Sequence, residues 1–185
     1  LQHPSARQKR VMDELLDLSD YVVVMTQKAI DILQAVHKID GSKILLIPHG
    51  IPDVSFIDTN FYKDQYGVEG KTALLTFGLL APHKGVEVVL RALPKVIKEH
   101  PNTVYIIVGA THPNLLRHEG EAYRLFLQRL CDVLGVSRNV IFHNRFVSPE
   151  ELKELLVLAD IYITPYLEEA QIISGTLAYS FGAGN

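Results

Sequence analysis

The chain has 185 residues, of which 48% are hydrophobic and 21% charged, with a formal net charge of −3 at pH 7, as in ordinary soluble globular proteins. The sequence has no dense run of Lys and Arg, which excludes the electrostatic footprint of a nucleic-acid-binding protein, so no nucleic-acid partner is expected. The single cysteine, Cys131, excludes an internal disulfide, and no apolar run reaches the ~20 residues that span a bilayer.

The first 54 residues alternate between apolar residues at helical spacing and short apolar runs of strand length. The expected elements are, in chain order, a helix over residues 11–18, a strand over 21–25, a helix over 29–36 and a strand over 43–47. Together they predict one β–α–β unit, which prolines and a glycine end at residues 48–53. Residues 55–70 are polar, aromatic and aperiodic, and we expect a linker there.

A second alternating series follows the expected linker. Its expected strands are residues 73–77, 104–108, 140–142 and 161–164, and its expected helices are residues 85–99, 121–134, 149–158 and 175 to near the end. The strands are rich in Val and Ile without polar alternation, as when helices cover both faces of a parallel sheet. Ser148, Pro149 and Glu151 predict a helix start with a capping box. The predicted fold class from residue 71 onward is therefore α/β, with a doubly wound parallel sheet.

Two turns in this series join the end of a strand to the start of a helix. Lys84 lies in the turn that follows Gly78, while Ser174, Gly175 and Thr176 open the last helix. Unpaired backbone N–H groups and the positive end of the helix dipole make such turns suitable for phosphate. Because both turns follow the carboxyl ends of strands, we expect a nucleoside-diphosphate site.

Each candidate residue also has an ordinary structural interpretation. Lys84 either neutralises phosphate charge or is a solvated lysine, and residues 174–176 either meet phosphates or simply cap a helix. Arg145 either reaches a phosphate with its guanidinium group or pairs with a surface carboxylate. Glu168 and Glu169 either accept hydrogen bonds from sugar hydroxyls or belong to a solvent-facing loop.

Several known site motifs are missing from the sequence. It contains no G-x-G-x-x-G or Walker loop, no G-x-S-x-G nucleophile turn and no H-E-x-x-H metal motif. It also contains no Asp-x-Asp, the usual acidic anchor for a metal-bound nucleotide sugar. We therefore expect neither a metal nor a cofactor. Gly109, at the end of its strand, is expected to relieve crowding there.

Taken in order, these segments resemble the family 4 (group 1) glycosyltransferases, which have the two-domain GT-B fold. The segments that carry the resemblance are residues 46–51, 77–78 with 84–85, 105–109, 140–142 and 159–165. Residues 109–113 and 144–148 are most similar to those of bacterial mannosyltransferase-like members. Because the chain starts at Leu1 rather than at Met, we expect a fragment of such an enzyme, truncated at its C-terminus.

The resemblance implies a domain organisation and a donor site. Residues 1–54 would be the C-terminal remnant of the acceptor-side Rossmann-like domain, and residues 71–185 an incomplete donor-binding Rossmann-like domain. The implied donor-site contacts are Gly78, Lys84, Ser174, Gly175 and Thr176 for the diphosphate, and the backbone around Phe146 and Val147 for the base. No catalytic residue is assigned, and Glu168 and Glu169 are the candidates.

Three positions depart from the family pattern. Leu79 stands where the family usually has an arginine, and the two family glutamates fall on Gln171 and Tyr179. Arg145 is a candidate replacement for the missing cation. Glu168 or Glu169 is a candidate replacement for a missing acid.

The implied activity is that of a retaining transferase. It would move a hexose from a nucleoside-diphosphate sugar, with GDP-mannose as the first expectation, to a glycan or lipid-linked acceptor. The leaving phosphate would take the acceptor's proton, so no protein nucleophile is required. We expect a cytoplasmic protein, with peripheral association of the full-length protein at the inner face of the membrane as an open alternative.

Two other functions fit the same residues. A GT-B sugar-nucleotide epimerase would share the phosphate turns but act on one substrate, and a sugar- or nucleotide-binding module would have no turnover. The 185-residue chain alone is expected to be inactive as a transferase, because most of one wall of the cleft would be missing.

Overall fold

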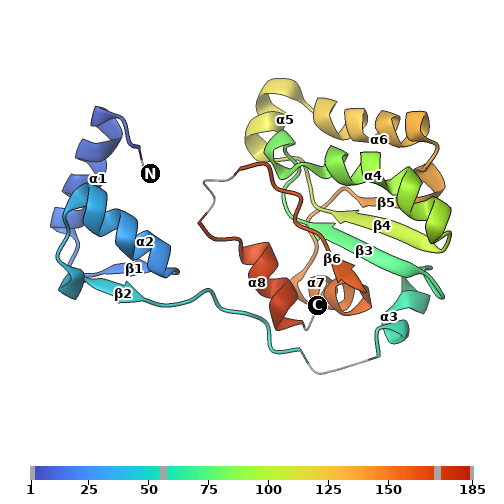
Figure 1. The fold of residues 1–185 in the computed structure, drawn as a ribbon, viewed down its shortest axis with the longest axis horizontal. Coiled ribbons are helices and arrows are strands. Elements are labelled where there is room, and N and C mark those ends of the chain that lie inside the picture. The colour runs from blue at the N-terminus through green and yellow to red at the C-terminus, as the bar shows by residue number, and fades with distance from the viewer. Residues whose placement is uncertain (1–2, 55–57, 169–171, 184–185) are drawn as a thin grey trace. The chain divides into compact units, whose positions relative to one another are not determined.

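The computed structural model describes residues 3–54, 58–168 and 172–183 (Figure 1). These residues fall into two compact units. Residues 3–50 and 172–175 make up the first unit, and the remaining described residues make up the second.

The first unit contains the predicted β–α–β arrangement. Its elements are α1 (Ala6–Leu18), β1 (Val22–Val24), α2 (Gln27–Ile32), a π-helical turn (Leu33–His37) and β2 (Ile44–Leu46). Strands β1 and β2 pair in parallel, with Val22 opposite Ile44. Helix α1 begins five residues before the predicted start because Ser5 and Gln8 form a capping box that the sequence analysis overlooked.

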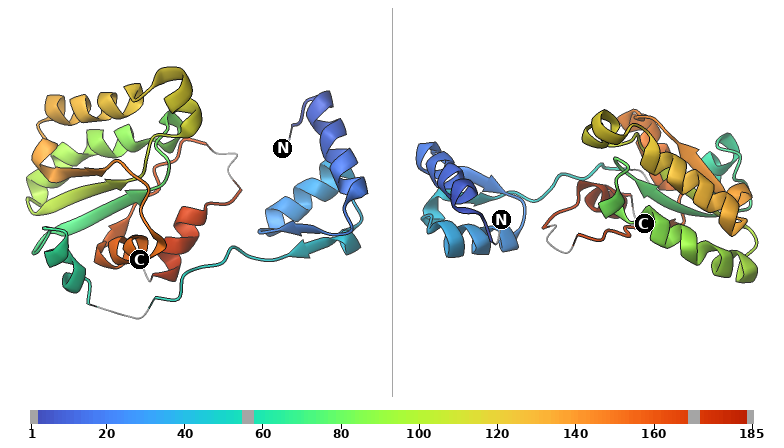
Figure 2. Two further views of the ribbon diagram at one scale, coloured as in Figure 1. Left: turned by 180° about the vertical axis from the view of Figure 1, so that it is seen from behind. Right: turned by 90° about the horizontal axis from the view of Figure 1, so that it is seen from above.

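The second unit is a parallel four-stranded sheet with helices on both faces (Figure 1, Figure 2). The strands are β3 (Thr72–Phe77), β4 (Thr103–Val108), β5 (Val140–His143) and β6 (Ile161–Tyr162), in the spatial order β5-β4-β3-β6. The helices are α3 (Asn60–Gln65), α4 (Val86–Glu99), α5 (Pro113–Glu119), α6 (Ala122–Leu134), α7 (Pro149–Leu158) and α8 (Gly175–Gly182). This architecture confirms the predicted doubly wound α/β fold.

Successive strand residues pack into two separate cores. Tyr105 and Ile107 of β4 contact α4 and α6 on one face, where Cys131 is also buried as predicted. Val104 and Ile106 point to the opposite face, which α7 covers together with parts of α3 and α8. All six residues of β4 are buried, which explains the absence of polar alternation in this strand.

The sheet has a topological switch point between β3 and β6. Strand β3 is followed by α4 on one face of the sheet, whereas the segment after β6 leads to α8 on the other face (Figure 1). The loops that follow these neighbouring strands therefore leave the sheet in opposite directions. In open α/β sheets, ligands bind in the crevice outside the strand carboxyl ends at such a point.

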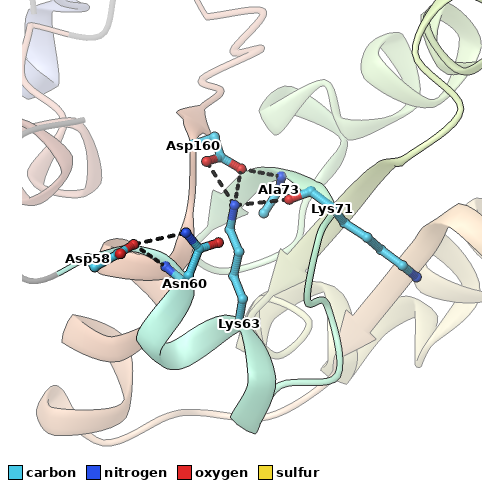
Figure 3. Close-up of polar contacts among 6 residues, drawn as sticks. All are labelled: Asp58, Asn60, Lys63, Lys71, Ala73 and Asp160. Carbon is cyan, nitrogen blue, oxygen red and sulfur yellow. Dashed lines mark hydrogen bonds and ion pairs between the residues drawn. The ribbon is translucent and has the colours of Figure 1, made fainter.

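The segment expected to be a linker contains a helix that the sequence analysis did not predict. Lys63 of α3 is 5% exposed, and its Nζ lies 2.7 Å from Oδ2 and 2.9 Å from Oδ1 of Asp160 (Figure 3). The same ammonium donates to the Lys71 carbonyl, while the Ala73 amide donates to Asp160 Oδ2 over 2.7 Å. This buried ion pair ties α3 to the amino ends of β3 and β6, at the edge of the sheet opposite the switch-point loops.

Two other differences have local causes. Strand β6 is two residues shorter than predicted: Ile163 still donates to Leu75 O over 2.8 Å, but Pro165 has no N–H with which to extend the pairing. Helix α5 was not predicted. It begins at Pro113, directly after His112, whose ring nitrogen accepts a hydrogen bond from the amide of Asn114.

Candidate functional site

The carboxyl ends of β3 and β4 are in direct backbone contact. Gly78 follows β3 with φ 134°, and Gly109 follows β4 with φ 141°, both outside the range that side chains favour. A Cβ atom on Gly109 would lie 2.0 Å from the carbonyl oxygen of Gly78. This close approach confirms the prediction that Gly109 relieves crowding.

Lys84 lies where the chain turns from β3 into α4. A single turn of 3-10 helix (Pro82–Lys84) ends at Gly85, which has φ 67° and precedes α4. The loop after β6 packs on this turn: a Cβ on Gly85 would lie 2.0 Å from Pro165 O, and Leu167 N donates to His83 O over 2.9 Å. The loops that follow β3 and β6 are therefore packed directly against each other.

The Lys84 ammonium lies over an aromatic ring. Its Nζ is 4.0 Å from the centroid of the Tyr166 ring, and the Tyr166 hydroxyl is 2.7 Å from Oγ1 of Thr176 near the start of α8. Among the described residues, no carboxylate lies within ion-pair distance of Lys84. Its positive charge is thus held in the crevice without a counter-charge. Tyr166 was not among the predicted site residues.

Beside this crevice lies a pocket of about 200 Å³. Its lining is mostly apolar and comes from the ends of β3 and β4 and from the segment between β5 and α7. The lining residues are Phe77, Gly78, Leu79, Val108, Gly109, Ala110, Arg145, Phe146, Val147 and Leu152. The structure thus brings together Gly78, Arg145, Phe146 and Val147, which the sequence analysis selected separately. Phe146 is 72% exposed at the rim.

Arg145 is paired with a carboxylate, which is one of its two predicted interpretations. Its Nη1 lies 2.7 Å from Oε2 of Glu151, and Nη2 bonds the other carboxylate oxygen. This bidentate contact holds the pKa of Glu151 below its usual value. Ser148 Oγ accepts from the Glu151 amide as predicted, but the Glu151 side chain goes to Arg145, so the predicted capping box is wrong in its second half.

The predicted turn at the start of α8 is divided between the two units. Ser174 and Gly175 belong to the first unit and Thr176 to the second. Of these three predicted residues, only Thr176 therefore lies in the same unit as Lys84. The Glu168 side chain is exposed, and Glu169 lies outside the described residues.

The three departures from the family pattern have different positions. Leu79 lines the pocket and adds no charge there. Tyr179 is half-buried and packs against the core on the α7 face. Gln171 lies outside the described residues.

Metal-ligand clusters and membrane-spanning helices are both absent from the described residues. In the part of the chain that the structure describes, no three or more His, Cys, Asp or Glu side chains gather as they would around a metal ion. No helix within residues 3–54, 58–168 and 172–183 has the length and apolar character needed to cross a bilayer.

Comparisons with known proteins converge on one family. The sequence model of the family described as "Glycosyl transferases group 1" matches residues 58–171. A GDP-mannose-dependent alpha-(1-6)-phosphatidylinositol monomannoside mannosyltransferase of Mycolicibacterium smegmatis is 31% identical over 103 residues, which are 56% of this chain and 24% of that protein. A phosphatidyl-myo-inositol mannosyltransferase of Mycobacterium tuberculosis is 39% identical over 85 residues, or 46% of this chain and 22% of that one.

Solved structures show the same fold. Anabaena Alr3699/HepE in complex with UDP superposes with a TM-score of 0.72 at 19% identity, covering 90% of this chain and 44% of that one. WaaG, a glycosyltransferase involved in lipopolysaccharide biosynthesis, gives a TM-score of 0.65 at 24% identity, covering 88% and 42%. These likenesses confirm the predicted GT-B fold. The chain spans less than half the length of these structures and about a quarter of the curated relatives it matches.

Proposed function

Since this chain belongs to the group 1 glycosyl transferases, we propose that it binds a nucleoside-diphosphate sugar and serves a retaining hexosyl transfer to a glycan or lipid-linked acceptor. The observation that carries the proposal is the position of Lys84. Its ammonium lies at the switch point of the sheet, next to a pocket of about 200 Å³, and has no ion-pair partner among the described residues.

The two parts of the site suit the two parts of a nucleotide. The apolar pocket suits a base, and its lining includes Phe146, Val147 and the close-packed glycines Gly78 and Gly109. Lys84 and the start of α8 at Thr176 offer positive charge to the diphosphate. Glu168 and Glu169 remain the candidates for contact with the sugar hydroxyls.

These groups would act mainly by positioning and by electrostatics. Negative charge develops on the departing diphosphate, and a fixed ammonium with helix N–H groups stabilises that charge most where water is excluded. The leaving phosphate would itself accept the acceptor's proton, so the protein supplies no nucleophile. We propose that no metal ion takes part, because these cationic groups fill the role that a divalent ion has elsewhere.

The first donor to test is GDP-mannose. The Mycolicibacterium relative is named as GDP-mannose-dependent, and both it and the Mycobacterium relative are named as mannosyltransferases that act on phosphatidylinositol compounds. We extend this to the present chain, with a lipid-linked acceptor reached by peripheral association at the cytoplasmic face of a membrane.

The decisive experiment is product analysis. Labelled GDP-mannose is incubated with the full-length protein, with and without phosphatidylinositol vesicles, and the products are separated. Transfer of label to lipid together with release of GDP supports the proposal. A changed sugar nucleotide without acceptor would indicate an epimerase, and binding without any product would indicate a binding module. Failure to bind GDP, UDP or their sugars would overturn the donor site itself.

A further inference from the structure

We propose that Tyr166 is the positioning residue for Lys84. Its ring holds the ammonium in the crevice without neutralising it, so that the positive charge is already in place when a diphosphate binds. This inference rests on the proposed function, because it concerns the same donor site. Tyr166 is not among the residues predicted from the sequence, and its contact with Lys84 joins the loops that follow two different strands, β3 and β6.

The Tyr166 ring is attached to backbone that is held on both sides. Its loop rests on the turn that carries Lys84, through the close approach of Pro165 O to Gly85 and the Leu167–His83 backbone hydrogen bond of 2.9 Å. These contacts flank Tyr166 on both sides in the sequence. The backbone on both sides of the Tyr166 ring is therefore packed on the turn that carries Lys84.

The hydroxyl group of Tyr166 fixes the orientation of the ring. Tyr166 Oη is 2.7 Å from Thr176 Oγ1, so the tip of the side chain is attached to the start of α8. With both ends held, the face of the ring stays toward Lys84, whose Nζ lies 4.0 Å from its centroid. An ammonium within about 6 Å of a tyrosine ring centroid is attracted by the negative face of the ring.

The two cations of the site are held in different ways. Arg145 is held by both oxygens of the Glu151 carboxylate, which cancels its charge and occupies its guanidinium fork. Lys84 is held by an uncharged ring instead. A lysine ammonium has three donors, and an aromatic face leaves its full positive charge in place. The aromatic contact thus restrains Lys84 while leaving the charge available to a ligand.

Restraint of this kind matters because lysine is among the side chains that lose most rotamer freedom when they are ordered. A side chain that is already ordered before the ligand arrives does not lose that freedom on binding. Tyr166 would therefore raise affinity for phosphate-containing ligands only, and would do so only through Lys84.

The experiment compares Tyr166→Leu with Tyr166→Phe, using calorimetric binding of GDP and of guanosine to the full-length protein. Tyr166→Leu removes the ring, whereas Tyr166→Phe keeps the ring and removes only the hydroxyl. We expect Tyr166→Leu to lower GDP affinity about 3- to 30-fold, the range of a cation–π contact. Tyr166→Phe should lose clearly less GDP affinity than Tyr166→Leu, because it keeps the ring contact and loses only the hydroxyl bond that orients the ring. Guanosine affinity should be the same in all three proteins.

A second comparison is made in the Lys84→Ala background, where Tyr166→Leu should have no further effect on GDP affinity. An equal loss for guanosine and GDP, a loss that persists without Lys84, or equal losses for Leu and Phe would each overturn the positioning role. If Lys84→Ala weakens GDP binding but Tyr166→Leu does not, only this inference fails. If the unsubstituted protein does not bind GDP or UDP, or if Lys84→Ala binds GDP equally well, the proposed function fails first.

Discussion

Gly85 and Pro165 touch through their backbones: a Cβ atom on Gly85 would lie 2.0 Å from the Pro165 carbonyl oxygen. This contact joins the loop after β3 to the loop after β6, and it lies next to both Lys84 and Tyr166. A glycine is required at this position for two reasons, its φ of 67° and the lack of space for a side chain.

Gly85→Ala should destabilise the protein by about 3 kcal/mol, because left-handed strain adds to a backbone clash. Gly135→Ala is the matched control: Gly135 has φ 69°, but nothing lies within 4 Å of its added Cβ, so only the strain of about 1 kcal/mol applies. Urea unfolding of both variants measures the difference. Equal losses of stability in the two variants would mean that the loop after β6 does not pack on the turn that carries Lys84.

Asp160→Asn tests the buried ion pair that holds α3. The asparagine keeps the shape of the side chain but leaves the Lys63 ammonium, which is 5% exposed, without a counter-charge. We expect a loss of about 3 kcal/mol in the free energy of unfolding. A Lys63→Met/Asp160→Asn double variant should recover part of this loss, because it removes the unpaired charge.

Lys71→Met is the control for Asp160→Asn. Lys71 contributes only its backbone carbonyl to the cluster, and its side chain points away from Asp160 (Figure 3). The loss of the Lys71 charge should change the free energy of unfolding by less than about 0.5 kcal/mol. If Asp160→Asn is equally mild, the ion pair does not hold α3 in place.

The β/α alternation could be predicted from the sequence because local patterns determine it. Helix α7 has the predicted bounds, Pro149–Leu158, since Ser148 caps it and the apolar spacing runs through it. Strand β4 was recognisable from its continuous Val and Ile content, which reflects burial on both faces. The residues that carry each of these patterns lie close together in the sequence.

Contacts between distant residues explain what was missed. Helix α3 has only six residues and is stabilised by an ion pair to Asp160, 97 positions away from Lys63. Short helices gain little from their own sequence, so no local pattern marks them. Tyr166 was missed for the same reason, because its role depends on a lysine after another strand. The available signal was its place directly after Pro165, at the end of the predicted strand over residues 161–164.

Glycosyl transfer by the full-length protein should survive metal chelation. The motivating observation is the ammonium of Lys84, which has no ion-pair partner among the described residues and supplies positive charge beside the pocket. Rates with GDP-mannose are measured before and after EDTA treatment, and with Mg²⁺ added back. Unchanged rates are expected. Loss of activity on chelation that Mg²⁺ restores would contradict metal independence.

Lys84 and Arg145 should contribute very differently to nucleotide binding, although both are cations beside the same pocket. Lys84→Ala should weaken GDP binding by about 2–3 kcal/mol, or roughly 30- to 150-fold, because it removes a charge-assisted contact. Arg145→Ala should cost less than about threefold, since Glu151 already occupies the guanidinium fork and the pair is exposed.

Guanosine binding is the control for both variants, because guanosine has no phosphate for either cation to contact. Titrations at two salt concentrations add a second criterion: the salt dependence of GDP affinity should fall in Lys84→Ala and stay unchanged in Arg145→Ala. If Arg145→Ala proves as costly as Lys84→Ala, the guanidinium must leave Glu151 to bind the diphosphate. Arg145 would then replace the arginine that the family usually has at the position of Leu79.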